Sequence, residues 1–88
     1  MKTQSLTFHT DPGHGWLEVT RAQLDALNIT AQITPYSYQH RDRVYLEEDI
    51  DAGLYMETAR AAGYRLTLDS NNHSNDYSPI RNFPRFTI

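Results

Sequence analysis

Residues 5–24 read SLTFHTDPGHGWLEVTRAQL, and this stretch decides the first half of the fold. Apolar and polar residues alternate in SLTFH (5–9) and again in WLEV (16–19), which is the period of a half-buried strand. A short glycine-rich segment separates the two runs, so we expect them to pair as a hairpin. Leu17 is predicted to face the core, and Trp16 to lie on the outer face of its strand.

A helix start follows the second strand directly. Thr20 is a favourable N-cap residue, and Gln23 lies three residues later as its capping-box partner. These signals predict a short helix over residues 21–27. Asn28 is suited to the left-handed conformation that ends a helix, so the helix is expected to stop there.

The middle of the chain contains a second hairpin, a second helix and a last strand. Residues 35–39 (PYSYQ) and 43–47 (RVYLE) favour β-structure on either side of a polar turn. Residues 51–62 place small residues at helical spacing, which favours packing against a sheet, and Gly63 is a natural C-terminal stop. Residues 64–69 alternate again, as a strand does.

The C-terminal part is polar at first and then apolar and aromatic, with two prolines. We expect residues 70–78 to form a flexible loop and residues 79–88 to form an extended tail. The tail is expected to dock on the body of the protein through Ile80, Phe83 or Phe86.

The element order ββαββαβ predicts a single small α+β domain over residues 1–88, with an antiparallel sheet and two short helices on one face. A domain this short has a thin core, and no cysteine is present to form a disulfide. A homodimer contact or another partner is therefore an open alternative for stabilising it. The absence of cysteine fits a reducing cytoplasm.

Charge and hydropathy restrict the classes of partner. The net charge is −3 and Lys2 is the single lysine, which argues against direct nucleic-acid binding because phosphate neutralisation needs clustered basic residues. No secretion signal and no apolar run of bilayer length is recognisable, so we expect a cytoplasmic protein without a membrane partner.

The segment HTDPGHGW (9–16) allows two interpretations. His9, Asp11 and His14 have side chains that suit a divalent metal such as zinc, manganese or iron, if they converge. The alternative is a type II β-turn, with Pro12 at its second position and Gly13 supplying a positive φ at its third. We favour the turn, predict no cofactor, and keep the metal site as an alternative.

An acidic run, LEEDID (46–51), precedes the second helix. Carboxylates near a helix N-terminus are stabilised by the backbone dipole and can cap free N–H groups. Four of them, Glu47, Glu48, Asp49 and Asp51, are more than capping requires. A solvated patch is one interpretation, and a recognition patch for a basic surface is the other.

Four aromatic residues are the other candidate contacts with a partner protein. Tyrosine and tryptophan are typical interface anchors because they combine a large rigid area with a polar tip. The alternative is that they form ordinary cross-strand pairs in a thin sheet. The residues are Tyr36, Tyr38, Tyr45 and Trp16.

Other chemistries have less support in the sequence. The tail interleaves Arg81 and Arg85 with Phe83 and Phe86, a pattern found in single-stranded nucleic-acid binders, but we favour docking of the tail on the core. No nucleophile elbow or other activating motif is recognisable among the serines and histidines, so we do not expect an enzyme.

The segments DPGHGWLEV, PYSY followed by VYLEEDIDA, and SPIRNFPRF together resemble a group of small proteins from phages, prophages and plasmids of proteobacteria. The resemblance implies an accessory protein of a mobile genetic element that acts inside a bacterial host cell. Such accessories often bind and block host machinery, so an anti-CRISPR or other anti-defence function is one expectation.

The leading hypothesis from these observations is a non-enzymatic protein-binding module. It would use the acidic run and the exposed aromatic residues to occupy a basic surface, for example on a nucleic-acid-binding defence complex of the host. The second hypothesis is a metal-binding protein or metal-dependent enzyme that uses His9, Asp11 and His14. The third is a nucleic-acid binder that works through its C-terminal tail.

Overall fold

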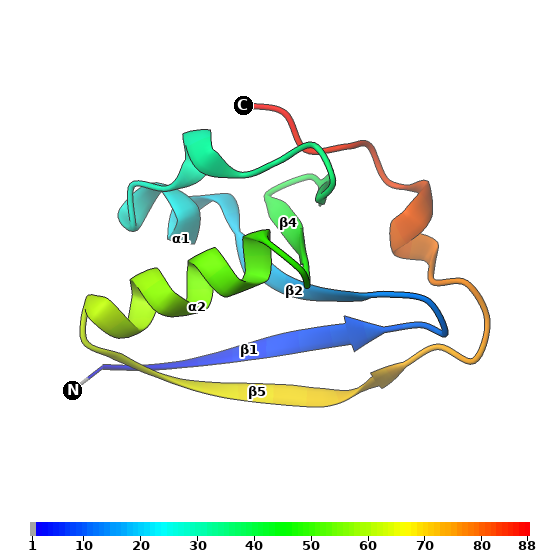
Figure 1. Ribbon diagram of the computed structural model, residues 1–88, viewed down its shortest axis with the longest axis horizontal. Helices are drawn as coiled ribbons and strands as arrows, with labels where there is room; N and C mark the ends of the chain where they lie inside the picture. The colour runs from blue at the N-terminus through cyan, green and yellow to red at the C-terminus, as the bar shows by residue number, and fades with distance from the viewer. Residues whose placement is uncertain (1) are drawn as a thin grey trace.

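The computed structural model describes residues 2–88 and has the expected α+β class (Figure 1). The predicted order ββαββαβ is confirmed, with two short 3-10 helices added. The elements are β1 (Lys2–Thr10), β2 (Gly15–Thr20), α1 (Arg21–Ala26), η1 (Thr30–Gln32), β3 (Tyr38–His40), β4 (Arg43–Glu47), α2 (Asp51–Ala61), β5 (Tyr64–His73) and η2 (Pro79–Asn82).

The five strands form one sheet in the order β3-β4-β2-β1-β5. The pairs β1–β2, β2–β4 and β3–β4 are antiparallel, but β1 and β5 are parallel, so the prediction of a wholly antiparallel sheet was wrong. The physical reason is the crossover through α2. A helix packed on a sheet reverses the chain direction, so β5 runs parallel to β4 and therefore also to β1.

Local sequence signals correctly predicted the start of α1 and the ends of both helices. The Thr20 hydroxyl accepts a hydrogen bond from the Gln23 backbone N–H at 3.0 Å, and the Gln23 side chain accepts one from the Thr20 N–H at 2.8 Å. This capping box starts α1 as expected. Asn28 and Gly63, which follow the two helices, have φ angles of 59° and 96°. Both helix ends therefore use the left-handed residue that the sequence indicated.

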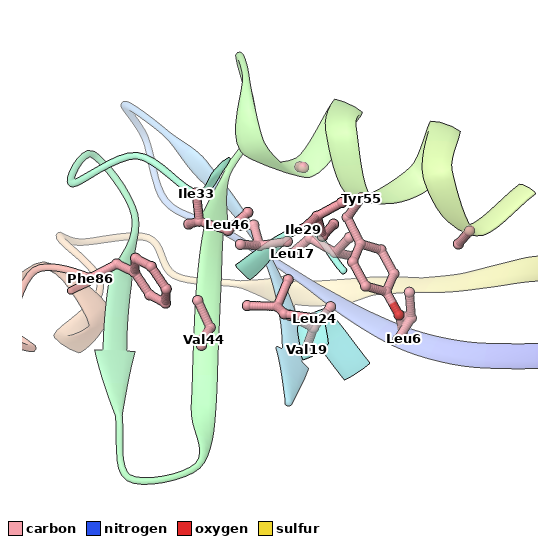
Figure 2. Close-up of a cluster of buried hydrophobic side chains, with 12 residues drawn as sticks. Leu6, Leu17, Val19, Leu24, Ile29, Ile33, Val44, Leu46, Tyr55 and Phe86 are labelled. Atoms are coloured by element: carbon pink, nitrogen blue, oxygen red, sulfur yellow. The ribbon is translucent and has the colours of Figure 1, made fainter. Parts of the chain in front are cut away.

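The core lies between the helices and one face of the sheet (Figure 2). Leu17 and Leu46, which are paired on β2 and β4, are fully buried and contribute to it. Leu24 of α1 and Tyr55 of α2 join the same cluster, so both helices cover one face, as predicted. Tyr55 is buried but donates its hydroxyl to Gln4 Oε1 at 2.8 Å, which satisfies the polar tip.

The C-terminal segment differs in part from the expectation. The strand β5 continues to His73, so the first residues of the predicted loop 70–78 are strand. They pair with β1 up to Thr10, which supplies backbone partners that no local pattern reveals. The tail contains η2 and is therefore not wholly extended, but Ile80 and Phe86 are buried, which confirms docking on its own chain.

The second hairpin is shorter than predicted, because β3 starts only at Tyr38. The preceding residues turn instead, and the Ser37 N–H donates to the Thr34 carbonyl at 3.2 Å. No helix in residues 2–88 has both the length and the apolar character needed to span a membrane.

Candidate binding groove

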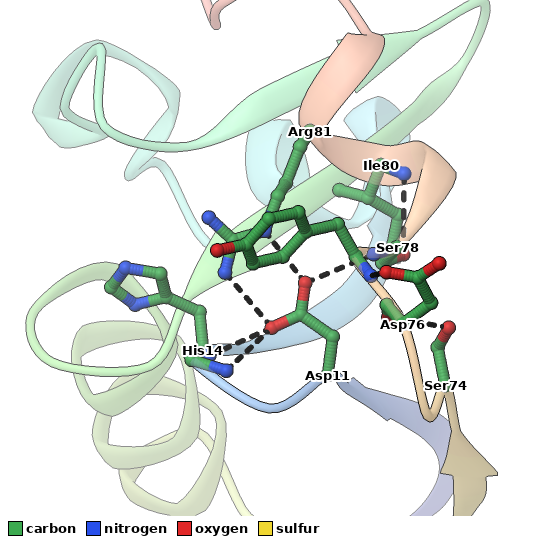
Figure 3. A network of polar contacts seen from close by, with 9 residues as sticks. Asp11, His14, Ser74, Asp76, Ser78, Ile80 and Arg81 are labelled. Atoms are coloured by element: carbon green, nitrogen blue, oxygen red, sulfur yellow. Dashed lines mark hydrogen bonds and ion pairs between the residues drawn. The ribbon is translucent and has the colours of Figure 1, made fainter.

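Asp11, at the end of β1, organises the loop that the sequence singled out (Figure 3). Its Oδ1 accepts hydrogen bonds from the backbone N–H groups of Gly13 and His14, both at 2.9 Å. Its Oδ2 accepts from the Ser78 N–H at 3.0 Å. Arg81 donates to both carboxylate oxygens, with Nε 2.6 Å from Oδ2 and Nη2 2.9 Å from Oδ1. One buried carboxylate thus joins the β1–β2 turn to the tail.

The type II turn predicted for this loop was wrong, since Gly13 does not have a positive φ. The Asp11 side chain holds the turn instead, by mimicking a backbone acceptor for the two residues that follow Pro12. The Arg81 guanidinium, assisted by the backbone N–H groups of Ser78, Gly13 and His14, holds the pKa of Asp11 far below its ordinary value, against the opposing effect of burial.

Arg81 also lies over two aromatic rings. Its guanidinium carbon is 5.6 Å from the centroid of Trp16 and 4.7 Å from that of Tyr77. Trp16 is on the outer face of β2, opposite the core, as predicted. It is nevertheless only 2% exposed, because the tail covers the outer face. Trp16 is therefore the floor of a site and not a protruding anchor.

A groove of about 560 Å³ opens beside this network, between the β1–β2 turn, the segment before β3, the start of α2 and the tail. Its walls carry aromatic rings, two carboxylates and two guanidinium groups. The lining residues are His14, Trp16, Tyr36, Tyr38, Glu47, Asp49, Ile50, Arg81 and Arg85.

Three of the four predicted aromatic contacts line the groove, with Trp16 at its floor and Tyr36 and Tyr38 as its aromatic wall. The Trp16 and Tyr38 rings meet edge to face with centroids 6.3 Å apart. Arg85 lies over Tyr38 at 5.0 Å and donates to the Pro35 carbonyl. Tyr36 is 64% exposed and is therefore the freest ring of the wall.

Tyr45 does not belong to the groove. It lies farther along the outer face of β4, where its ring is 5.7 Å from the centroid of His9 and 5.3 Å from that of Phe83. Burial, followed by the nearby Glu18 carboxylate, raises the pKa of Tyr45 above its ordinary value. For Tyr45 the cross-strand packing interpretation describes the structure.

The acidic run divides into structural and exposed members. Glu47 accepts hydrogen bonds from the N–H groups of Asp49, Ile50 and Asp51 at 2.9, 2.6 and 3.0 Å, so it caps the start of α2. Glu48 and Asp49 are exposed. The four carboxylates therefore do not form one surface patch.

Asp51 in particular is fully buried, which corrects its prediction as a partner contact. Its Oδ2 accepts from the Thr34 N–H at 3.0 Å, the Thr34 hydroxyl at 2.7 Å and the Ser37 hydroxyl at 2.5 Å. A buried carboxylate needs such donors, and these come from a segment that the sequence could not place beside it. Asp51 therefore anchors the segment before β3 to α2.

The three predicted metal ligands do not converge. His9 Nε2 is 2.7 Å from Glu18 Oε1, both Asp11 oxygens are taken by Arg81 and the turn, and His14 is exposed beside Trp16. Within residues 2–88, no group of three or more histidine and carboxylate side chains is placed to hold a metal ion. The loop is therefore a turn held by the Asp11 side chain, although not the type II turn that was predicted, and the geometry does not support the metal site.

The tail residues considered for nucleic-acid stacking have other contacts. Arg81 pairs with Asp11, and Arg85 lies over Tyr38. Phe86 is buried, and Phe83 stacks on His40 with centroids 4.6 Å apart. These contacts support docking of the tail over stacking on bases.

Arg81, Arg85 and His14 were not predicted as members of a protein-binding site. The alternation of arginine and aromatic residues in SPIRNFPRF was a signal for the two arginines, but it was interpreted as a nucleic-acid pattern. Which rings they cover depends on the path of the tail over the outer face.

The fold and the groove define a small α+β protein with a mixed five-stranded sheet and an aromatic, mixed-charge site on its outer face. Comparisons with family models, curated proteins and solved structures find no match for the chain.

Proposed function

We propose that the chain is a non-enzymatic protein-binding module that takes an exposed segment of a partner protein into the groove. The observation that carries this proposal is the exposed Tyr36 ring beside the buried floor of Trp16. Rigid aromatic area of this kind supplies most of the energy in many protein interfaces. A groove of about 560 Å³ is also in the range that encloses a few side chains.

The charges of the groove define the partner chemistry. Glu47 and Asp49 lie on one side, and Asp49 and the neighbouring Glu48 are exposed. Arg81 is neutralised by Asp11, and Arg85 lies over the Tyr38 ring and donates to the Pro35 carbonyl. The Asp49 carboxylate is therefore free to receive a basic side chain, and the aromatic wall is free to receive the apolar residues beside it.

The resemblance to proteins of phages, prophages and plasmids supports a bacterial partner. A host defence complex with a basic, nucleic-acid-binding surface has the charge that the Glu48 and Asp49 carboxylates would attract. Inhibition of such a complex is the function we propose for this binding.

Photo-crosslinking in a bacterial host tests the proposal. A benzophenone amino acid replaces Tyr36 in one variant and Glu57, which is exposed on α2, in the control variant. We expect one discrete protein adduct from position 36 and none from position 57. The adduct should weaken when Asp49→Lys is added, and purified partner should lose its nucleic-acid binding in proportion to occupancy.

Adducts of equal yield from both positions, or none from position 36, would contradict a groove interface. An adduct from position 36 that is indifferent to Asp49→Lys would limit recognition to the aromatic wall. Thermal unfolding of each variant shows that the comparison is made between folded proteins.

A further inference from the structure

The two edges of the sheet are treated differently by the fold. The β3 edge is covered by the tail: Tyr38 forms an antiparallel bridge with Arg85, and the Gln39 N–H donates to the Pro84 carbonyl at 2.8 Å. The β5 edge is the other end of the sheet (Figure 1), and among residues 2–88 its strand pairs only with β1. Its outward backbone groups are therefore available to another strand.

The first part of this edge is regular enough to act as a template. Residues 64–69 keep a continuous register with β1, from the Lys2–Tyr64 pair to the Thr7–Asp69 pair, and the irregularity comes only after Asp69. The segment contains neither proline nor lysine, the residues that commonly protect an edge. Six successive residues are thus open to strand pairing.

The sequence of this edge is self-complementary about Thr67. Residues 65–69 read RLTLD, so that Thr67 is flanked by two leucines and then by an arginine and an aspartate. We propose that two copies of the chain pair antiparallel along β5, with the two-fold axis at Thr67. Each Arg65 then lies opposite Asp69 of the second copy, which gives two ion pairs across the axis.

The same arrangement matches the apolar side. Leu66 packs against the core, whereas Leu68 is 40% exposed although it lies on the same face of β5. With the axis at Thr67, Leu68 lies opposite Leu66 of the second copy, so the exposed leucine is covered at the dimer interface. The two-fold axis is perpendicular to the sheet, and both helix layers fall on one face of a ten-stranded sheet.

Geometry excludes most other registers. Residues directly opposite in an antiparallel pair share a face, so the two-fold axis must lie midway between two copies of the same residue. An axis at Leu66 would place Arg65 opposite Thr67, and an axis at Leu68 would place Asp69 opposite Thr67. Of the three central positions, Thr67 alone pairs the opposite charges.

Charge exchange tests this dimer by light scattering and sedimentation of the purified chain. Arg65→Asp or Asp69→Arg alone makes both cross-strand pairs repulsive, so each variant should dimerise at least roughly tenfold more weakly than wild type. An equimolar mixture of the two variants restores both ion pairs, and it should form a heterodimer of wild-type strength. Arg41→Asp and Asp42→Arg, which make the same changes in the exposed β3–β4 turn, should leave dimerisation unchanged.

Cysteine crosslinking tests the register independently, because the chain has no native cysteine. Thr67→Cys places two thiols across the axis and should form a covalent dimer on mild oxidation. Asn71→Cys, which is also exposed on β5, places them many residues apart and should not. A monomeric wild type at near-millimolar concentration, a dimer insensitive to both charge reversals, or equal crosslinking at positions 67 and 71 would overturn the proposal.

Discussion

Asp11 shows how much one side chain can organise. It holds the β1–β2 turn through Gly13 and His14, and it binds the tail through Ser78 and Arg81. Its carboxylate is fully shielded from solvent, whereas the Arg81 side chain is 29% exposed. The charge is tolerated in this position because every contact is a donor.

Asp11 makes the stability of the protein sensitive to acid. Its pKa is lowered in the folded protein from an ordinary value of 3.8, so its contribution is complete above that pH and is lost progressively as the pH falls below it. We expect the free energy of unfolding to decrease steeply with acid below that value. Asp11→Asn should flatten this dependence and destabilise the protein by about 2 kcal/mol at neutral pH. Denaturant titrations over the acid range measure both effects, and a parallel pH dependence in the variant would contradict this role.

The acidic run predicts a contrast between two carboxylates of similar chemistry. Asp51→Ala removes the acceptor for Thr34 and Ser37 in the interior, and it should lower the free energy of unfolding by roughly 2 kcal/mol. Glu48→Ala, at an exposed position, should change it by less than about 0.5 kcal/mol. Chemical denaturation compares the two, and equal effects would show that Asp51 is not a structural carboxylate.

At the scale of the elements, α2 holds the site and the core together. Its first residue, Asp51, is anchored by hydrogen bonds from Thr34 and Ser37. The N–H groups at its start are capped by Glu47, and Tyr55 is buried against the sheet. It also makes the crossover that brings β5 beside β1. The groove and the open edge thus both depend on where this helix lies.

Substitution by alanine should have opposite effects on stability at Gly53, which lies inside α2, and at Gly63, which follows its C-terminal end. A Cβ at Gly53, inside the helix, would meet no atom within 4 Å, so Gly53→Ala should stabilise the protein by about 0.5–1 kcal/mol. A Cβ at Gly63 would also meet nothing, but its φ of +96° is strained for alanine, so Gly63→Ala should destabilise by about 1 kcal/mol. Thermal unfolding gives the sign directly, and the same sign for both would contradict the backbone argument.

At the scale of the whole molecule, the C-terminal tail closes the outer face. Ile80 and Phe86 anchor it, and between them Arg81 and Phe83 cover rings of the sheet. The Trp16 floor of the groove is therefore covered by Arg81, which pairs with Asp11 at a separation of 70 positions along the chain.

Trp16, the single tryptophan, reports the state of this tail. Ile80→Ala removes a buried anchor, so it should destabilise the protein by roughly 2 kcal/mol or more and shift the Trp16 emission to longer wavelength. Ile88→Ala, at an 85% exposed position, is the matched control and should change neither. Far-UV circular dichroism identifies any loss of fold, and an unchanged emission in folded Ile80→Ala would show that the tail does not shield Trp16.

Much of the fold was predictable because its signals are local. The alternation of β1 and β2, the Thr20–Gln23 capping box and the left-handed Asn28 and Gly63 are set by neighbours within a few residues. The site was only partly predictable. Trp16 was placed on the correct face, but its burial under Arg81 depends on a segment at the other end of the chain.

The sequence by itself determined the order of the elements, the ends of both helices and the face of β2 that carries the core, because these follow from periodicity and backbone preference. Tertiary structure alone decided the parallel pairing of β5, the Asp11–Arg81 pair, the burial of Asp51 and the shape of the groove. Each of these joins residues far apart in the chain, and the direction of a crossover or the path of a tail is fixed only when all surfaces pack together.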